Sequence, residues 1–274
     1  MFGERLAENN PGGKDPIRWR GREVARIEAF SDAVFGFALT LLIVALEVPS
    51  NFDQLLLIMR GFFAFGLCFV LLFQVWYFQY RFFRRYGLND LPTILLNATL
   101  LFVILFYVYP LKFLFNVLVM GNEHVENGIA GAAIERGQYR ELMLIYGTAV
   151  VLIYALLAFM YRHALKRSTD LDLTREEIFH TKTNMYDHLL LVGVAFISIL
   201  VAFLLPREHS AMAGMVYILI APILSIFQRV RRKKALQLAE AGSEATVEAP
   251  MALDEDGIAA APGPQAGKTD PDRS

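Results

Sequence analysis

The sequence has little of what enzymes and secreted proteins commonly use. Its single cysteine, Cys68, lies inside an apolar run, so it supports neither a disulfide framework nor a cysteine-based metal site. The five histidines show no H-E-x-x-H or comparable spacing, and no nucleophile elbow, Walker loop or dinucleotide fingerprint occurs. We therefore predict no catalytic residue, no metal and no cofactor, and we do not expect an enzyme.

Charge is also scarce. Only 19% of the 274 residues are charged and 55% are hydrophobic, which is too apolar for an ordinary soluble domain. The net charge of −1 gives no basis for binding nucleic acid. Residues 1–25 lack the apolar core of a signal peptide. These properties indicate an all-α, polytopic membrane protein.

Hydropathy divides the chain into three parts. Residues 1–25 are predicted to form a disordered cytoplasmic arm, residues 26–228 a domain of six transmembrane helices, and residues 229–274 a basic segment and a disordered cytoplasmic tail. The helices are predicted over residues 26–49, 54–83, 91–119, 142–161, 186–205 and 212–227.

Smaller features mark the segments inside and between these helices. Pro110 is expected to kink the third helix, because it removes one backbone donor. The glycine-rich residues 120–140 are predicted to form an exposed loop, and Thr174 to cap a short helix that precedes the fifth. His180 and His188 lie in or beside the basic cytoplasmic loop predicted over residues 162–182, so we expect both to be solvated.

The basic residues predict the orientation in the membrane. Four basic groups fall on one side if six helices alternate, over residues 18–26, 81–85, 162–182 and 229–234. Because lysine and arginine concentrate on the cytoplasmic side, both termini are predicted to be cytoplasmic and the protein to lie in the plasma (inner) membrane.

The first predicted helix carries more polar residues than a simple membrane span. Arg26, Ser31 and Asp32 lie near its start, Thr40 in its middle and Glu47 near its end. A charged side chain at bilayer depth costs about 2.5–3.5 kcal/mol on insertion scales, so such residues usually face a bundle interior or a watery cavity. This helix is therefore the candidate functional element.

Helical periodicity sorts this segment into faces. Phe37, Leu41 and Val44 form one stripe, Gly36 and Thr40 a neighbouring one, and the Ser31–Asp32 pair points elsewhere. On periodicity alone the apolar stripe faces lipid or packs against a neighbour, with Gly36 and Thr40 as a small-residue helix contact. A pore-lining stripe is the alternative.

The opening of this helix follows the pattern R-x-x-x-F-S-D, made by Arg26, Phe30, Ser31 and Asp32. An aliphatic run containing Thr40 follows and ends in Val48-Pro49. The pattern resembles the signature of the lysosomal potassium channel family (transmembrane protein 175), especially its bacterial members. The resemblance implies a potassium-selective or potassium-preferring cation channel. With one six-helix unit, it also implies a homotetramer in which the first helix lines a central pore.

Carried over by position, the family's constriction falls on Phe37, a polar layer on Thr40, and further apolar layers on Leu41 and Val44. Phe37 departs from the Ile or Leu usual in the family. Glu47 would lie at the pore mouth and attract cations, or it is a solvated charge at the helix end.

The resemblance also assigns partners to the Ser-Asp pair. Trp76 and Asn97 match positions that the family uses near the motif, and both offer hydrogen-bond donors to Ser31 and Asp32. We expect a structural role for this group, with direct ion binding by Asp32 as the alternative. Relatives often have a histidine pair soon after the tryptophan, where this chain has Gln79 and Tyr80.

Two other function classes remain open. A secondary transporter or proton-coupled carrier is one, although no internal inverted repeat is visible. A membrane scaffold whose basic loops bind anionic lipid or a partner is the other. For the channel, the expected partners are potassium ions, membrane lipid and further copies of the chain.

Overall fold

The computed structural model describes residues 18–21, 23–44, 51–52, 55–56, 59, 62–120, 123–126, 129–132, 134, 138–220 and 222–231. The long helices are α2 (Arg26–Val44), α4 (Phe62–Tyr86), α5 (Leu91–Met120), α6 (Tyr139–Lys166) and α7 (Arg175–Leu204). A 3₁₀ helix, η2 (Arg207–Leu219), and a final helix over residues 222–231 follow. Strands β1 (Glu123–Glu126) and β2 (Ile129–Ala132) form an antiparallel hairpin.

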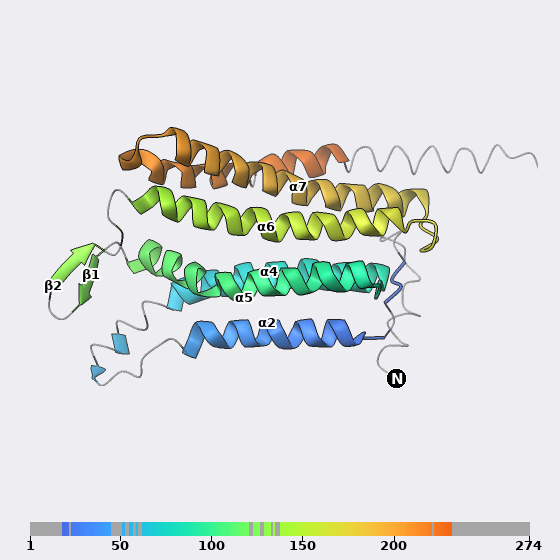
Figure 1. The fold of residues 1–274 in the computed structure, drawn as a ribbon, viewed down its shortest axis with the longest axis horizontal. Helices are drawn as coiled ribbons and strands as arrows, with labels where there is room; N and C mark the ends of the chain where they lie inside the picture. The colour runs from blue at the N-terminus through green and yellow to red at the C-terminus, as the bar shows by residue number, and fades with distance from the viewer. Residues whose placement is uncertain are drawn as a thin grey trace, which may run out of the picture.

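The long helices lie side by side (Figure 1), with α2 at one edge, α4 and α5 beside it, then α6, and α7 with η2 on the far side. The main contacts of α2 are with α4 and α5. The hairpin lies at one end of the bundle, and the turns that join α4 to α5 and α6 to α7 lie at the other (Figure 1). We call this second end the turn end. Because α2 lies at the edge, one of its faces is turned away from the other described helices.

The core joins four of the five long helices. Phe82 and Tyr86 of α4 pack edge-on against Tyr161 of α6, with ring centroids 5.4 and 5.9 Å apart. Around them lie further buried apolar side chains of α2, α4, α5 and α6, including Phe35, Leu42, Phe83, Leu100, Ile104, Leu157 and Met160. Burying such side chains stabilises the fold by about 1.5–3 kcal/mol each where they leave water. This core holds α2 against the bundle by one face.

The helix α7 differs from its prediction. The capping box at Thr174 and Glu177 is present, with the Glu177 amide donating to Thr174 Oγ1 over 3.2 Å and the Thr174 amide to Glu177 Oε2 over 3.0 Å. However, the predicted boundary between a short helix and one starting at residue 186 is wrong, since one helix runs to Leu204. Nothing in this stretch breaks it, because no proline occurs before Pro206. Leu205 is extended at ψ 150°, as expected for the residue before a proline.

The other boundaries also shift. The glycine-rich segment contains the β1–β2 hairpin, and Ile134 is buried, so the prediction of an exposed loop over residues 120–140 is wrong there. The region predicted as one helix over residues 212–227 is a 3₁₀ helix followed by a helix over residues 222–231. Ile220 already has α-helical backbone angles, and the described helix continues from Pro222 to residue 231. Helical structure also continues past the predicted domain boundary at residue 228.

Part of the arm predicted to be disordered is placed against the bundle. The Gly21 amide donates to the Arg84 carbonyl over 3.1 Å, at the end of α4. Gly87 ends that helix with a φ of +59°, a left-handed conformation that glycine adopts without steric cost. Residues 18–21 therefore belong to the turn end of the bundle. Residues 1–17 and 232–274 lie outside the described part of the chain.

Four of the described helices are long and apolar enough to cross a membrane, by length and composition. They cover Leu91–Leu114, Tyr139–Lys166, Arg175–Leu204 and Met212–Arg231. Their outward surfaces carry exposed aromatic and aliphatic side chains, among them Phe102, Phe106, Phe159 and Phe196. This is the surface of a protein whose solvent is lipid. The protein is therefore a multi-pass membrane protein.

Candidate functional site

The helix α2 has two different faces. Glu28, Ser31, Phe35, Ala38 and Leu42 are all buried, and they recur at the three- and four-residue spacing of one helix face. On the opposite side Phe30, Phe37 and Thr40 are exposed, and Phe37 keeps 57% of its surface accessible. The polar residues of the opening motif thus help to fix the helix, while an aromatic and a hydroxyl group face outward.

Neutral polar side chains from three helices meet at the buried face of α2. The Asn97 amide on α5 donates to Ser31 Oγ over 2.9 Å, and Ser31 Oγ donates to the Ile27 carbonyl over 2.7 Å. Gln79 on α4 in turn donates from Nε2 to Asn97 Oδ1. All three side chains are almost completely buried. We call Ser31, Asn97 and Gln79 the amide cluster, and its bonds fix the register of α2 against α4 and α5.

Asp32 is placed differently from its neighbour. Its Oδ1 accepts a hydrogen bond of 2.7 Å from the indole N–H of Trp76, while the residue itself is exposed. Trp76 stacks on Tyr80 with ring centroids 5.4 Å apart, which limits the orientations of the indole. The structure therefore brings Asp32 to Trp76 and Ser31 to Asn97.

A small hollow adjoins the opening motif. It has a volume of about 230 Å³, and its lining includes Glu28, Asp32, Gln79, Tyr80 and Arg84. Glu28 also accepts a hydrogen bond of 3.2 Å from the Ala25 amide, which caps the start of α2. Polar side chains thus line a space large enough for water beside the Asp32 carboxylate.

The remaining residues predicted to line a pore lie further along α2. Thr40 Oγ1 donates to the Phe37 carbonyl over 2.7 Å, and Leu41 is partly buried against the core. Val44 is the last residue of the helix. Glu47 lies outside the described residues. Arg26 and Phe30, the first residues of the motif, are exposed at the start of the helix.

Two positions differ from what the sequence indicated. The sequence marks Gln79 only as a departure from the family pattern, yet it completes the amide cluster. Gln79 comes three residues after Trp76, so both side chains lie on one side of α4. This spacing is the signal in the sequence that identifies Gln79. The prediction that His188 is solvated is wrong, because it is 3% exposed and packs against the rings of Phe78, Tyr154 and Tyr161.

Within the described residues, no group of three histidine, cysteine, aspartate or glutamate side chains is placed to hold a metal ion. The arrangement of the site positions side chains. One face of α2 is tied down by hydrogen bonds and apolar packing, and the other carries Phe37 and Thr40 outward from the bundle. An edge helix of this kind can line a shared space between copies or pack against another surface.

Comparison with known proteins gives the class, which is that of an ion channel. Residues 26–107 match the family model described as the endosomal/lysosomal potassium channel TMEM175. Over 246 residues the chain is 38% identical to a potassium channel of Marivirga tractuosa, covering 85% of this chain and 98% of the relative. The chain belongs to the bacterial TMEM175 potassium channel family.

Two further relatives were found. A crystal structure of the potassium channel MtTMEM175, a threonine-to-alanine variant in complex with a nanobody–MBP fusion protein, has a TM-score of 0.69 and 36% sequence identity. The match covers 81% of this chain and 99% of that one. The potassium channel Cha6605_3372 of Chamaesiphon minutus is 30% identical over 105 residues, which cover 35% of this chain and 52% of the relative.

Proposed function

We propose that this protein is a potassium-selective or potassium-preferring cation channel, in which four copies surround a pore lined by α2. The observation that carries the proposal is the two-sided character of α2 in a chain of this family. Its buried face is fixed by the amide cluster, and its exposed face presents Phe37 and Thr40. A helix held in this way keeps its outward side chains in a constant position, as a pore constriction requires.

The proposed selectivity rests on the cost of removing water from the ion. A ring of Phe37 side chains, one from each copy, forms a narrow apolar segment that excludes water. Sodium holds its hydration water more tightly than potassium, so such a segment penalises sodium more. Leu41 and Val44 extend the apolar layer toward Glu47, which we place at the pore mouth.

Thr40 supplies the polar layer in this proposal. Its hydroxyl proton is used within the helix, in the bond to the Phe37 carbonyl. The two lone pairs of the hydroxyl oxygen then remain available to a passing cation. Asp32 acts through Trp76 rather than on the ion, since its bond holds α2 against α4.

We also propose that the chain lies in the plasma (inner) membrane with both termini cytoplasmic and six spans. Basic side chains gather at the turn end, where α4 and α6 end and α7 begins, including Arg84, Arg85, Lys166, Arg167 and Arg175. Lysine and arginine concentrate on the cytoplasmic side of membrane proteins.

The test is potassium and sodium flux into liposomes at matched protein density. Phe37→Ser and Phe37→Asn should raise potassium flux and weaken discrimination against sodium, because water enters the constriction, whereas Phe37→Ile should stay selective. Phe196→Ser is the matched control, since Phe196 on α7 is similarly exposed, at 61%, and lies away from α2. If the two polar Phe37 variants conduct like the parent with unchanged ion preference, α2 does not line the pore through Phe37.

The tetramer is tested separately by native mass spectrometry of the detergent-solubilised protein. A mass of four chains is expected. A monomer or dimer that still conducts would contradict the proposed pore.

A further inference from the structure

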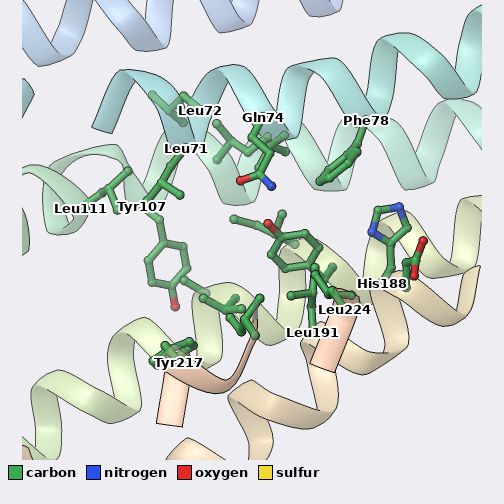
Figure 2. A pocket seen from close by; sticks show the side chains of 18 of the residues that line it. Leu71, Leu72, Gln74, Phe78, Tyr107, Leu111, His188, Leu191, Tyr217 and Leu224 are labelled. Atoms are coloured by element: carbon green, nitrogen blue, oxygen red, sulfur yellow. The ribbon is translucent and has the colours of Figure 1, made fainter. Parts of the chain in front are cut away.

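A cavity of about 740 Å³ lies between α4, α5, α6, α7 and the final helix, away from the exposed face of α2. Figure 2 shows Gln74 and Phe78 of α4 facing His188 and Leu191 of α7 across this space, with Tyr107 and Tyr217 toward its other end. Its volume falls within the range of roughly 300–1,000 Å³ typical of small-molecule sites. The channel proposed above does not use this space.

The charged groups of the cavity gather at the turn end of the bundle. Arg81, Asn184, Asp187, His188 and Gln228 line it there. His188 is almost completely buried, and its Nδ1 has no hydrogen-bond partner in the described structure, nor does one oxygen of Asp187. A buried polar atom without a partner costs about 1–3 kcal/mol, so His188 Nδ1 favours a ligand with a polar head group. The Asp187 oxygen only accepts hydrogen bonds, so it favours a head group that carries a hydroxyl or acid proton.

Most of the remaining cavity wall is apolar, although Gln74 and five tyrosines also line it. Leu71, Leu111, Ile153 and Leu191 are among the residues that line it. Leu71 and Arg81 lie about 15 Å apart along α4 at the helical rise of about 1.5 Å per residue. This length is half of the roughly 30 Å hydrocarbon core of a bilayer, which is the length of one leaflet of acyl chains.

The final helix carries a second arginine, Arg231, near the polar end of the cavity. The Arg231 guanidinium lies over the rings of Phe179, Tyr186 and Phe227, at 5.3, 5.1 and 5.2 Å from their centroids. Arg231 and Arg81 both act electrostatically on Asp187. Arg231 lies outside the cavity lining, so Arg81 is the guanidinium that offers charge-assisted hydrogen bonds to an anionic group in the cavity.

We propose that this cavity binds a single-chain anionic amphiphile of the membrane. Its acyl chain fills the apolar part, and its carboxylate or phosphate head group lies against Arg81, Asn184 and His188. The Arg81 guanidinium donates charge-assisted hydrogen bonds to the head group, and the His188 ring supplies a further polar contact. The site lies within one chain, so it does not depend on the proposed tetramer or on ion conduction.

The test is native mass spectrometry of the full-length protein titrated with four probes, which are oleate, lysophosphatidylglycerol, methyl oleate and inorganic phosphate. Oleate and lysophosphatidylglycerol should bind saturably with one molecule per chain. Methyl oleate lacks the anionic head and inorganic phosphate lacks the acyl chain, so both should bind at least tenfold more weakly.

Two pairs of variants locate the site. Arg81→Gln should lower the affinity for oleate about tenfold, whereas Arg162→Gln, an exposed arginine of α6 outside the cavity lining, should not. Leu191→Trp fills the cavity and should abolish saturable binding, whereas Leu189→Trp points to the exposed side of the same helix and should keep it. Arg81→Gln requires no repacking of the core, so it tests the site even if Leu191→Trp folds poorly.

Two kinds of result would contradict the proposal. Equal binding of oleate and methyl oleate would show that the polar end recognises no anion. Unchanged oleate binding by Arg81→Gln, or by a folded Leu191→Trp, would place the bound lipid on the outer surface. Either result overturns the proposal.

Discussion

Two regions of hydrogen bonds connect the helices of this protein, and they differ in charge. The amide cluster of Ser31, Asn97 and Gln79 is neutral and ties α2 to α4 and α5. The second region, at the turn end, is charged. There the Glu177 carboxylate accepts hydrogen bonds from the Arg18 amide, both terminal nitrogens of Arg20 and the Thr174 amide, at 2.8–3.0 Å.

The difference follows from where each region lies. Asn97 belongs to a helix apolar enough to cross a membrane, where an unpaired charge is costly and neutral amides and hydroxyls can satisfy one another. Glu177 lies in the first turn of α7, where the free amides of the helix start and a nearby arginine stabilise a negative charge. The neutral region fixes the pore candidate, and the charged one fastens residues 18–20 to α7.

Removing the Glu177 carboxylate should have the largest effect. Glu177→Ala leaves the Arg20 side chain, which is only 19% exposed, without its carboxylate partner and removes the side-chain half of the capping box, the bond from the Thr174 amide. We expect a loss of about 3–5 kcal/mol in the free energy of unfolding, measured by thermal unfolding in detergent. The neighbouring Glu176 is exposed, so Glu176→Ala is the control and should change little. Equal melting temperatures for the two variants would contradict this role.

Breaking the amide cluster should lower the free energy of unfolding by less than Glu177→Ala does. Asn97→Ala removes the acceptor of Gln79 and the donor to Ser31, and we expect a loss of about 1–3 kcal/mol because a buried polar group is left unpaired. Thr99→Ala, two residues further on the exposed side of α5, is the control. The same thermal assay applies, and an Asn97→Ala protein as stable as Thr99→Ala would show that the cluster contributes no net stability.

Asp32 should matter through assembly and to a smaller extent. Asp32→Ala loses one exposed hydrogen bond to Trp76, worth about 0.5–1.5 kcal/mol, so tetramer yield or thermal stability should fall. Asp32→Asn should be milder because its amide oxygen can still accept from the indole. Size-exclusion chromatography measures the yield. A fully stable Asp32→Ala tetramer with altered ion selectivity would make Asp32 a pore residue instead.

The smallest expected effect is a pH dependence at Asp90, before the start of α5. Burial acts to raise the pKa of this carboxyl, but hydrogen bonds from Thr93 and His163, the latter 2.6 Å from Asp90 Oδ2, outweigh it and hold the pKa below 3.8. The stabilisation from the ionised Asp90 is therefore present above the ordinary pKa of an aspartate and is lost as the pH falls through the lowered pKa.

Thermal unfolding of the parent and of Asp90→Asn at a series of pH values tests this. The parent should be more stable by under about 1 kcal/mol at neutral pH, and the difference should vanish in strong acid. Thr93→Val, which removes one of the hydrogen bonds, should give part of the same effect. A difference that persists unchanged into strong acid would show that the Asp90 charge is not its cause.

Much of the fold follows from patterns visible in the sequence. The apolar runs predict the existence of the long helices, and for α5 the bounds to within one residue; the Thr174 capping box is visible as four letters. Where the predictions failed, a local signal was missing. Nothing near residue 186 marks a helix start, and the glycines at residues 121–137 do not reveal a hairpin.

The candidate site was also predicted only in part from the sequence. The R-x-x-x-F-S-D motif identifies the family, which a relative 38% identical over 246 residues bears out. The partner of Ser31 on α5 is Asn97, 66 residues away, and the sequence predicts it through the resemblance. Gln79, which donates to Asn97, was not predicted. Hydrogen bonds between helices depend on how the helices are rotated and paired, which periodicity in one helix does not contain.

By itself, the sequence determined that the chain is a helical membrane protein and that its first helix is the unusual one, because composition, hydropathy and intramembrane polar residues are local properties. Only the tertiary structure decided which face of that helix is held and which is free, since this depends on the contacts that α4 and α5 make with it. The same holds for His188, which lies near a basic loop in the sequence and becomes buried because α7 packs it between aromatic rings of α4 and α6. The burial of a side chain therefore depends on how several helices pack together.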